Sequence, residues 1–328
     1  MATIKDIAMR AGVTATTVSR VINNRGYISR ETREKVRQAM EEMHYQPNEL
    51  ARALSMRRSN TIVAIVPHVS HPFFASLLSS LEDAASQRGY RLLLCNSREQ
   101  PEKVWEYMAT SVSNNAAGII LCSNNICPSC LRQLDLPIVN LERGEKEDGD
   151  GTVSIHCDNY QGGRLAAAHL IERGCRNLLH FGGITGKRMP ADRRGEGFSD
   201  VCREAGVLCT ILTADQKTYE LMSYRAFIEE ALRRRPETDG IFASSDLIAA
   251  QTLQVCAALG YSVPERMKIV GFDGTLVASI TTPTITTVIQ PVQRMAQLCV
   301  EHIEKLQHGE LVPDNVTMPV RLLQGEST

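Results

Sequence analysis

The sequence predicts two domains of different fold class: a small all-α headpiece and a large α/β core of two doubly wound subdomains. The first 46 residues carry only helical hydrophobic spacing. From residue 61 onward, short apolar runs of strand length alternate with amphipathic helical segments, and this alternation starts again after residue 160. A chain of 328 residues is long enough to bury the cores that these domains need.

The headpiece begins with two short amphipathic helices joined by a glycine turn, over residues 4–22. Thr3 can cap the first helix together with Asp6, which stands three residues later as a capping box requires. Gly12 interrupts the helical pattern, and Thr14 can cap the second helix. Helix, turn and helix in this order place a second helix in the major groove of DNA, although an ordinary helical hairpin has the same pattern.

A third helix is predicted to begin near Ser29 and to end before Pro47, which completes a domain over residues 1–46. Asn48 can then cap a short helix that runs through Leu54. Because so short a helix does not persist alone in water, residues 47–60 are predicted to be a linker that is helical only under some conditions.

The charge distribution separates the headpiece from the core. The formal net charge is −1, yet residues 1–60 contain eleven Lys or Arg against six Asp or Glu, and the remaining residues contain 25 against 31. A basic N-terminal region on an acidic body suits a module that binds a polyanion. A solvated charged face is the alternative interpretation.

The core is predicted over residues 61–328, and its first run, TIVAIVP, is typical of a strand buried on both faces of a parallel sheet. Ligands bind such sheets at the carboxyl ends of their strands, so a cleft between the two subdomains is the expected small-molecule site. Strands are predicted over residues 61–67, 91–96, 117–123, 137–142, 152–156, 177–183, 210–214, 240–245, 268–273, 286–291 and 316–323. Helices are predicted over residues 102–114, 162–173, 194–205, 219–235, 247–259 and 292–308, with a further one after the first strand.

Several motifs resemble the lactose-repressor (LacI) family of bacterial transcription regulators, and the resemblance covers essentially the whole chain. The motifs are IKDIAMRAGVTATTVSRVIN, YQPNELARAL, HPFF, DNYQGG, RRGEGF, SSD, GFDGT and TTVIQP. Within the family, the branch with sucrose-operon and ribose-operon repressors is the most similar. The resemblance implies a helix-turn-helix headpiece, a hinge helix and a core like a periplasmic sugar-binding protein. Three crossovers near residues 160, 290 and 319 would divide the core into an N-subdomain (about 61–160 and 291–319) and a C-subdomain (about 161–290 and 320–328).

The candidate DNA-binding residues lie in the headpiece and the hinge. Ala15 and Thr16 can contact thymine methyl groups, and Arg20 can bind either guanine or a phosphate. Candidate phosphate contacts, for which helix capping or solvation is the alternative, are Thr3, Thr17 and Asn23.

Leu54 stands in a polar, arginine-flanked linker, where a lone leucine has little core to join. The resemblance implies that it wedges into the minor groove, with the small Ala51 allowing two hinge helices to approach each other. A homodimer on a pseudo-palindromic double-stranded operator is therefore expected. Packing of Leu54 on the core is the alternative.

The candidate effector-binding residues follow strands of the core. Phe73 and Phe74 come after the first strand, and we expect one to stack on a sugar and the other to pack in the core. Arg194, next to Arg193, matches the family's ligand-binding arginine. The remaining candidates stand at strand ends or at a crossover, and they are Ser245, Asp246, Asp273 and Gln290. The expected effector is a small sugar or sugar phosphate of sucrose, fructose or ribose type, and an interdomain salt bridge is the alternative for the charged residues.

Other functions find less support in the sequence. It shows no export signal and no membrane span, and its ten cysteines are scattered, so a cytoplasmic protein with reduced thiols is expected. The lone pair Cys127 and Cys130 has no second ligand pair, so we expect no metal and no cofactor. No nucleophile–base motif predicts an enzyme. A sugar-binding protein or enzyme without DNA-binding activity is the alternative to a repressor.

Overall fold

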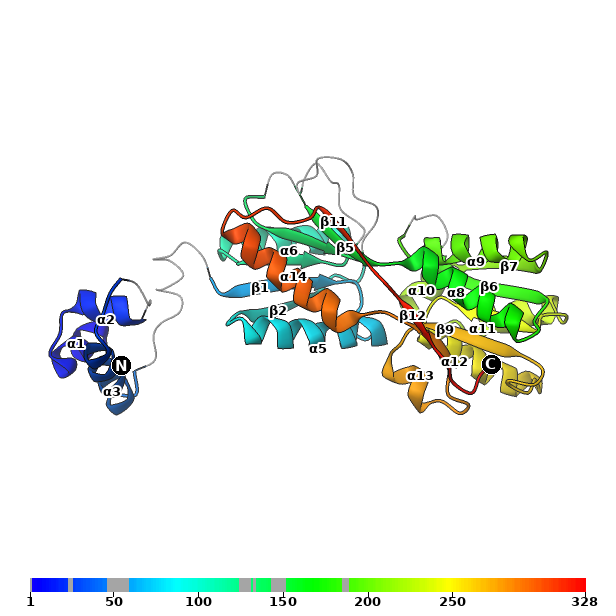
Figure 1. Ribbon diagram of the computed structural model, residues 1–328, viewed down its shortest axis with the longest axis horizontal. Helices are drawn as coiled ribbons and strands as arrows, with labels where there is room; N and C mark the ends of the chain where they lie inside the picture. The colour runs from blue at the N-terminus through cyan, green and yellow to red at the C-terminus, as the bar shows by residue number, and fades with distance from the viewer. Residues whose placement is uncertain are drawn as a thin grey trace. The chain divides into compact units, whose positions relative to one another are not determined.

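The computed structural model describes residues 2–22, 26–45, 59–123, 131, 134–142, 152–184 and 189–328 (Figure 1). The chain forms two compact units, Met1–Ser59 and Asn60–Thr328. No helix in the described ranges combines the length and apolar character that crossing a membrane requires.

The N-terminal unit contains three helices in its described part: α1 (Ile4–Ala11), α2 (Ala15–Ile22) and α3 (Arg30–Glu42). Their ends follow the predicted capping residues. Thr3 and Asp6 form a capping box, in which the Asp6 carboxylate accepts from the Thr3 amide at 2.8 Å. Gly12 ends α1 in the left-handed region at φ 68°, and the Thr14 hydroxyl accepts from the Thr17 amide at 3.1 Å. The helices share a small core of Ile7, Ala8, Val18, Val36 and Ala39.

The first sheet of the core has six strands in the order β11-β5-β4-β3-β1-β2, and all its neighbours are parallel. Alternate residues of its central strand point to opposite faces, as the period of a strand requires. Ile62 and Val66 pack with α5 and α14 on one face, whereas Val63 and Ile65 pack with α6 on the other. The strands are β1 (Thr61–Val66), β2 (Arg91–Asn96), β3 (Gly118–Leu121), β4 (Ile138–Leu141), β5 (Val153–Cys157) and β11 (Asn315–Met318), and the helices are α5 (Pro72–Gln87), α6 (Pro101–Ser113) and α14 (Val292–Gln307).

The second sheet also has six strands, in the order β12-β10-β9-β8-β6-β7, and only β12 runs antiparallel to its neighbour. The strands are β6 (Asn177–Ile184), β7 (Leu208–Ala214), β8 (Gly240–Ala243), β9 (Lys268–Asp273), β10 (Thr286–Ile289) and β12 (Arg321–Leu323). The helices of this half are α8 (Asn159–Glu172), α9 (Asp192–Glu204), α10 (Gln216–Leu221), α11 (Arg225–Arg234), α12 (Asp246–Leu259) and α13 (Leu276–Ile280). Both sheets are therefore doubly wound, which confirms the predicted fold class.

The chain passes between the sheets three times: after β5, after β10, and between β11 and β12, where Figure 1 shows the red segment running from one half to the other. The three connections lie next to each other. The Asp158 amide donates to the Met318 carbonyl at 2.8 Å, and Ile289 pairs with Arg321 across β10 and β12.

Two predicted elements are wrong in detail. The helix expected over residues 219–235 is two helices, α10 and α11, because Met222 adopts a left-handed φ of 52° between them. The strand expected over residues 316–323 is two strands, β11 and β12, that belong to different sheets. Pro319 stands between them and has no amide hydrogen to donate to a ladder.

Helices α8 and α9 cross unusually closely through two glycines. A Cβ atom on Gly163 would lie 1.9 Å from the carbonyl oxygen of Arg194, and one on Gly197 would lie 2.0 Å from that of Tyr160. No larger residue fits at either position without separating the helices. This crossing fixes α9 against the start of α8, next to the first connection between the sheets.

Candidate effector cavity and nucleic-acid interface

A cavity of about 110 Å³ lies at the carboxyl ends of strands from both sheets of the core. Its wall includes residues that follow β1, β4, β8, β9 and β10 together with the N-terminal end of α9. Six of the seven residues predicted to bind an effector line this single cavity: Phe73, Phe74, Arg194, Ser245, Asp273 and Gln290.

Arg194 is buried and held in one orientation by the groups around it. Its Nε donates to Asn159 Oδ1 at 2.7 Å, and its Nη1 donates to the Ser244 carbonyl at 2.5 Å. The guanidinium carbon lies 3.5 Å from the centroid of the Phe272 ring, an arrangement that favours a cation. Arg193, by contrast, is half exposed and approaches Glu196 on the outer surface of α9. The structure therefore places Arg194, and not its neighbour, in the cavity wall.

Asp273 ends β9 with a strained backbone, at φ 106°, which few residues other than glycine adopt. Its Oδ1 accepts from Gln290 Nε2 at 2.8 Å and lies 3.9 Å from Arg194 Nη1. Burial raises the pKa of Asp273 well above its usual value, while the nearby Arg194 opposes this change. Gln290 keeps its Oε1 atom buried without a hydrogen-bond partner among the described residues.

Asp246 differs from its predicted role, because it lies beneath the cavity and not in its wall. Its side chain is fully buried, and its carboxylate accepts from the amide and the hydroxyl of Thr275 at 2.7 and 2.9 Å and from the Thr287 hydroxyl at 2.6 Å. These bonds tie α12 to the turn after β9 and to β10. The adjacent Ser245 lines the cavity and also caps α12, since its hydroxyl accepts from the Ile248 amide at 3.2 Å.

The two phenylalanines contact each other edge to face, with ring centroids 5.2 Å apart. Phe73, in the first turn of α5, is buried in the core, whereas Phe74 is only partly buried. Both line the cavity, so Phe74 has the more accessible ring for a ligand.

Sequence reasoning missed several residues of the site. Glu142 follows β4, and its position at a strand end was a usable signal. His71 caps α5 through its Nδ1, which accepts from the Phe73 amide, and burial lowers its pKa to about 4. His68, between β1 and α5, and Tyr219, in α10, also line the cavity. No local sequence pattern indicates this, because it depends on how these segments pack in the fold. Asn159 does not line the cavity, but it links Arg194 to Glu142 by donating from Nδ2 at 3.1 Å.

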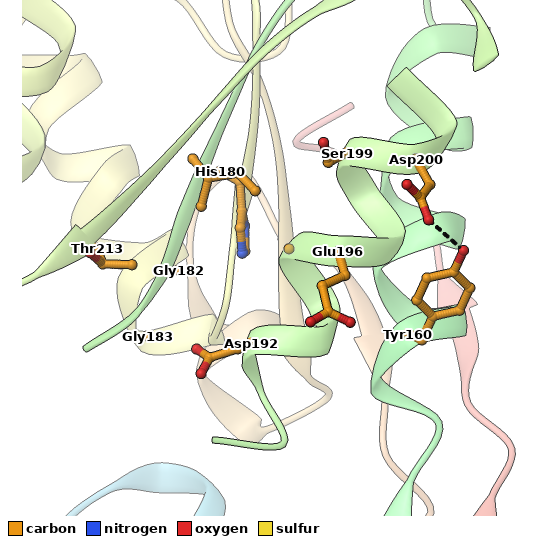
Figure 2. Close-up of a pocket in the computed structure, with 11 residues that line it drawn as sticks. Tyr160, His180, Gly182, Gly183, Asp192, Glu196, Ser199, Asp200 and Thr213 are labelled. Atoms are coloured by element: carbon orange, nitrogen blue, oxygen red, sulfur yellow. Dashed lines mark hydrogen bonds between the residues drawn. The ribbon is translucent and has the colours of Figure 1, made fainter. Parts of the chain in front are cut away.

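A second hollow, of about 600 Å³, lies between α9 and strands β6 and β7 (Figure 2). Its wall comes from one half of the core only, and it contains none of the predicted effector residues. His180 forms part of it, stacked on Phe242 with centroids 4.6 Å apart. Its Nδ1 lies 2.9 Å from the Phe242 carbonyl, and burial lowers its pKa to about 4. The smaller cavity between the sheets is therefore the candidate effector site.

The headpiece presents the start of α2 to solvent. Thr16 and Arg20 are exposed, Ala15 and Thr17 are half-buried, and the Thr17 hydroxyl contacts that of Thr14 at 2.9 Å. Arg20 forms no ion pair with any described residue, so its guanidinium is available to DNA. Thr3 is exposed, although its hydroxyl donates to Asp6 in the capping box.

Some predicted residues fall where the structure is not described. Asn23, Ala51 and Leu54 lie outside the described residues, as do Cys127 and Cys130. Among the residues that are described, no group of three His, Cys, Asp or Glu side chains could hold a metal ion.

Comparison with known proteins gives two family matches. Residues 3–48 match the bacterial regulatory proteins of the lacI family, and residues 167–328 match a periplasmic binding protein-like domain. The chain is 37% identical to a ribose operon repressor from Halalkalibacterium halodurans, over 100% of this chain and 97% of that protein. It is 35% identical to a sucrose operon repressor from Pediococcus pentosaceus, over 98% of each chain.

A solved structure extends the likeness to the fold. A periplasmic binding protein/LacI transcriptional regulator from Alkaliphilus metalliredigens, complexed with D-xylulofuranose, superposes with a TM-score of 0.74 and 31% identity. The match covers 82% of this chain and 99% of that one. Since a repressor more than one third identical matches it from end to end, the chain belongs to the lacI family of bacterial regulatory proteins.

Proposed function

We propose that the protein is a transcriptional repressor of a sugar-utilisation operon whose operator affinity changes when a small sugar occupies the cavity between the two sheets. The observation that carries this proposal is the convergence of six predicted effector residues on one cavity, in a chain whose residues 3–48 match a regulatory family. The repressors of ribose and sucrose operons among its relatives, and the D-xylulofuranose bound to the structural relative, support a sugar as the effector.

On the DNA side, we propose that α2 enters the major groove, with Arg20, Thr16 and Ala15 facing base edges and Thr3, Thr17 and Asn23 facing phosphates. The exposure of Thr16 and Arg20 supports this arrangement. Leu54 is proposed to wedge into the minor groove beside Ala51 of the hinge. Two copies of the headpiece would bind the two halves of a pseudo-palindromic operator as a homodimer.

We propose the following domain boundaries for the DNA-binding and effector-binding parts of the chain. The headpiece spans residues 1–46, the hinge 47–60 and the core 61–328, with an N-subdomain of about 61–160 and 291–319 and a C-subdomain of about 161–290 and 320–328. A ligand in the cavity touches groups of both subdomains, among them Phe74 and Arg194. It can shift the equilibrium between two conformations only by as much as its affinity for them differs.

A gel-shift experiment tests the proposal. The full chain is titrated onto DNA fragments from beside its own gene at rising salt concentration, with and without candidate sugars. A repressor is expected to show a steep salt dependence, a preferred fragment and a change of affinity with at least one sugar. Leu54→Ala is expected to lose the preference for that fragment. Absence of binding to every fragment would favour a sugar-binding protein or enzyme that does not act on DNA.

A further inference from the structure

The charge, hydrogen bonding and size of the candidate effector cavity restrict the class of ligand beyond "a sugar". We infer that the cavity takes an uncharged monosaccharide and rejects sugar phosphates and disaccharides. This inference rests on the proposed function, because it concerns the ligand of the same site.

The cavity contains more acidic than basic side chains. Glu142 and Asp273 supply two carboxyl groups, and Arg194 is the single Lys or Arg side chain among the described lining residues. Two histidines line the cavity as well, but burial lowers the pKa of both His68 and His71, which leaves them neutral at pH 7. A phosphate is normally bound by several positively charged or N–H donors. Among the described lining residues it would meet one cation and at least one carboxylate.

Two of the five N–H donors of that one cation are in use. Arg194 donates from Nε to Asn159 and from Nη1 to the Ser244 carbonyl, and Asp273 lies beside it. The second Nη1 hydrogen and both Nη2 hydrogens remain for a ligand. They can serve sugar hydroxyls, whereas a phosphate dianion would also need further cationic or N–H donors from the wall.

Helix N-termini could also bind a phosphate, and three helices, α5, α9 and α12, begin at the cavity. Several of their first amides, however, already donate within the chain. At the start of α9, the Asp192 and Arg193 amides donate to the Met189 and Pro190 carbonyls at 2.9 and 3.2 Å. The Phe73 amide donates to His71 Nδ1 at 3.3 Å at the start of α5, and the Ile248 amide donates to Ser245 Oγ at 3.2 Å at the start of α12. Pro72, at the first position of α5, has no amide hydrogen.

Two polar atoms in the cavity wall lack partners among the described residues, and they favour a ligand rich in hydroxyl groups. Gln290 Oε1 and His68 Nε2 are both buried. Because Gln290 uses its Nε2 atom to donate to Asp273, its oxygen can only accept. A sugar hydroxyl can donate to it, whereas a phosphate dianion has no hydrogen to offer.

The volume of the cavity sets a limit on ligand size. At about 110 Å³ it is smaller than the roughly 300–1,000 Å³ of common small-molecule sites. The larger hollow along α9 (Figure 2) shares Gly182 and Gly183 with this cavity, but Phe74, Asp273 and Gln290 do not line it. One sugar ring is therefore favoured over two.

Isothermal titration of the full-length protein tests this inference. The probes are D-ribose, D-fructose, D-xylulose and D-glucose, the corresponding 5- or 6-phosphates, and sucrose and cellobiose. At least one free monosaccharide is expected to bind, and its phosphate to bind at least about 100-fold more weakly, since like charges in a buried site cost several kcal/mol. A phosphate or a disaccharide that binds as tightly as every free monosaccharide overturns the inference but leaves the proposed function intact. If no sugar of any kind binds, both fail.

Two matched variants sharpen the test. Glu142→Gln removes a carboxylate from the cavity and is expected to narrow the difference between a free sugar and its phosphate by about tenfold. Glu204→Gln makes the same change in the surface pair with Arg164 and is expected to leave that difference unchanged. Equal behaviour of the two variants, with both folded by circular dichroism, contradicts the electrostatic basis of the inference. Deoxy analogues of the bound sugar supply an independent measurement, because losing the hydroxyl that meets Gln290 is expected to weaken binding about 10- to 100-fold.

Discussion

Asn159 holds Arg194 and Glu142 at once: its Oδ1 accepts from Arg194 Nε at 2.7 Å, while its Nδ2 donates to Glu142 Oε2 at 3.1 Å. Glu142 follows β4 of the first sheet, and Arg194 belongs to α9 of the second half. Asn159, at the start of α8, stands at the connection between them. The orientation of the cavity's arginine thus depends on contacts from both halves of the core.

Arg194→Lys is the most direct test of the cavity. Lysine keeps the charge but cannot reproduce the contacts to Asn159 and the Ser244 carbonyl, so effector affinity is expected to fall about 10- to 100-fold. Arg193→Lys is the matched control, because Arg193 is exposed on α9. Calorimetric titration with the best-binding sugar measures both. An equal loss in the two variants would show that the wrong arginine has been assigned.

Arg20→Lys tests whether Arg20 contacts a base of the operator or only a phosphate. A guanine contact needs the two-pronged guanidinium, so discrimination at one operator base pair is expected to weaken by about 1–3 kcal/mol while the salt dependence changes little. Arg37→Lys is the control, since Arg37 lies on α3 and pairs with Glu34 at 2.6 Å. Binding to single-base operator variants is the measurement. A uniform loss on all sequences would assign Arg20 to a phosphate instead.

Asp246→Asn tests whether the buried carboxylate stabilises the core without contacting the effector. The carboxylate accepts three hydrogen bonds, and an amide group would turn an N–H toward at least one of those donors. The free energy of unfolding of the core is therefore expected to fall by about 1–3 kcal/mol. Urea unfolding measures the loss. The effector affinity of the folded variant is expected to stay within a few-fold of that of the wild type. A much larger loss of affinity would indicate that Asp246 contacts the effector.

Stability of the core is expected to depend on pH through His180. The unfolded imidazole titrates near 6.5, whereas burial holds the folded pKa at about 4, so the unfolded state binds more protons between these values. The stability that neutral His180 contributes is fully present above pH 6.5 and is lost as the pH falls toward 4, by about 1.4 kcal/mol per pH unit.

His180→Phe removes this titration while keeping an aromatic ring in contact with Phe198 and Phe242. Buried Asp246, whose pKa is raised to about 6, acts in the opposite direction, and His71 acts in the same direction, but both are present in the two proteins. The difference in pH slope between variant and wild type isolates His180. Urea unfolding at several pH values between 7.5 and 4.5 measures it, and identical slopes would contradict the prediction.

Gly197→Ala tests the close crossing of α8 and α9. The added methyl group would overlap the Tyr160 carbonyl, so the helices must separate at a cost of about 1–3 kcal/mol or more. Because α9 carries Arg194, effector affinity is expected to fall together with the melting temperature. Ser199→Ala, on the same helix, is expected to change neither by a comparable amount. Unchanged stability in Gly197→Ala would show that the two helices tolerate a wider spacing.

Local chemistry explains which features could be predicted from the sequence. The caps Thr3 and Thr14 were predicted from short-range patterns, and the structure confirms both. Ser245, predicted only as an effector residue, also caps α12 beside the cavity. Apolar runs such as TIVAIVP identified buried strands for the same reason. The carboxyl end of a parallel strand also indicated where Asp273 would lie.

The remaining features depend on contacts between distant segments. Asp246 is adjacent to a cavity residue in sequence, and only the positions of Thr275 and Thr287 determine that its carboxylate points away from the cavity. Residues 316–323 were predicted as one strand, and the assignment of β11 and β12 to different sheets depends on how the two halves of the core share the end of the chain. Tyr219 lines the cavity from α10, which ends at the left-handed Met222, a break that the predicted single helix over residues 219–235 did not contain.

The three adjacent connections between the sheets have a mechanical consequence. Sliding one half of the core along the other would stretch at least one of the segments near Asp158, Gln290 and Pro319, whereas a rotation about an axis through them leaves their lengths nearly unchanged. The connections therefore favour rotation of the two halves over sliding. A ligand that bridges the halves is then expected to change the angle between them, so chemically different ligands should produce conformations that differ mainly in that angle.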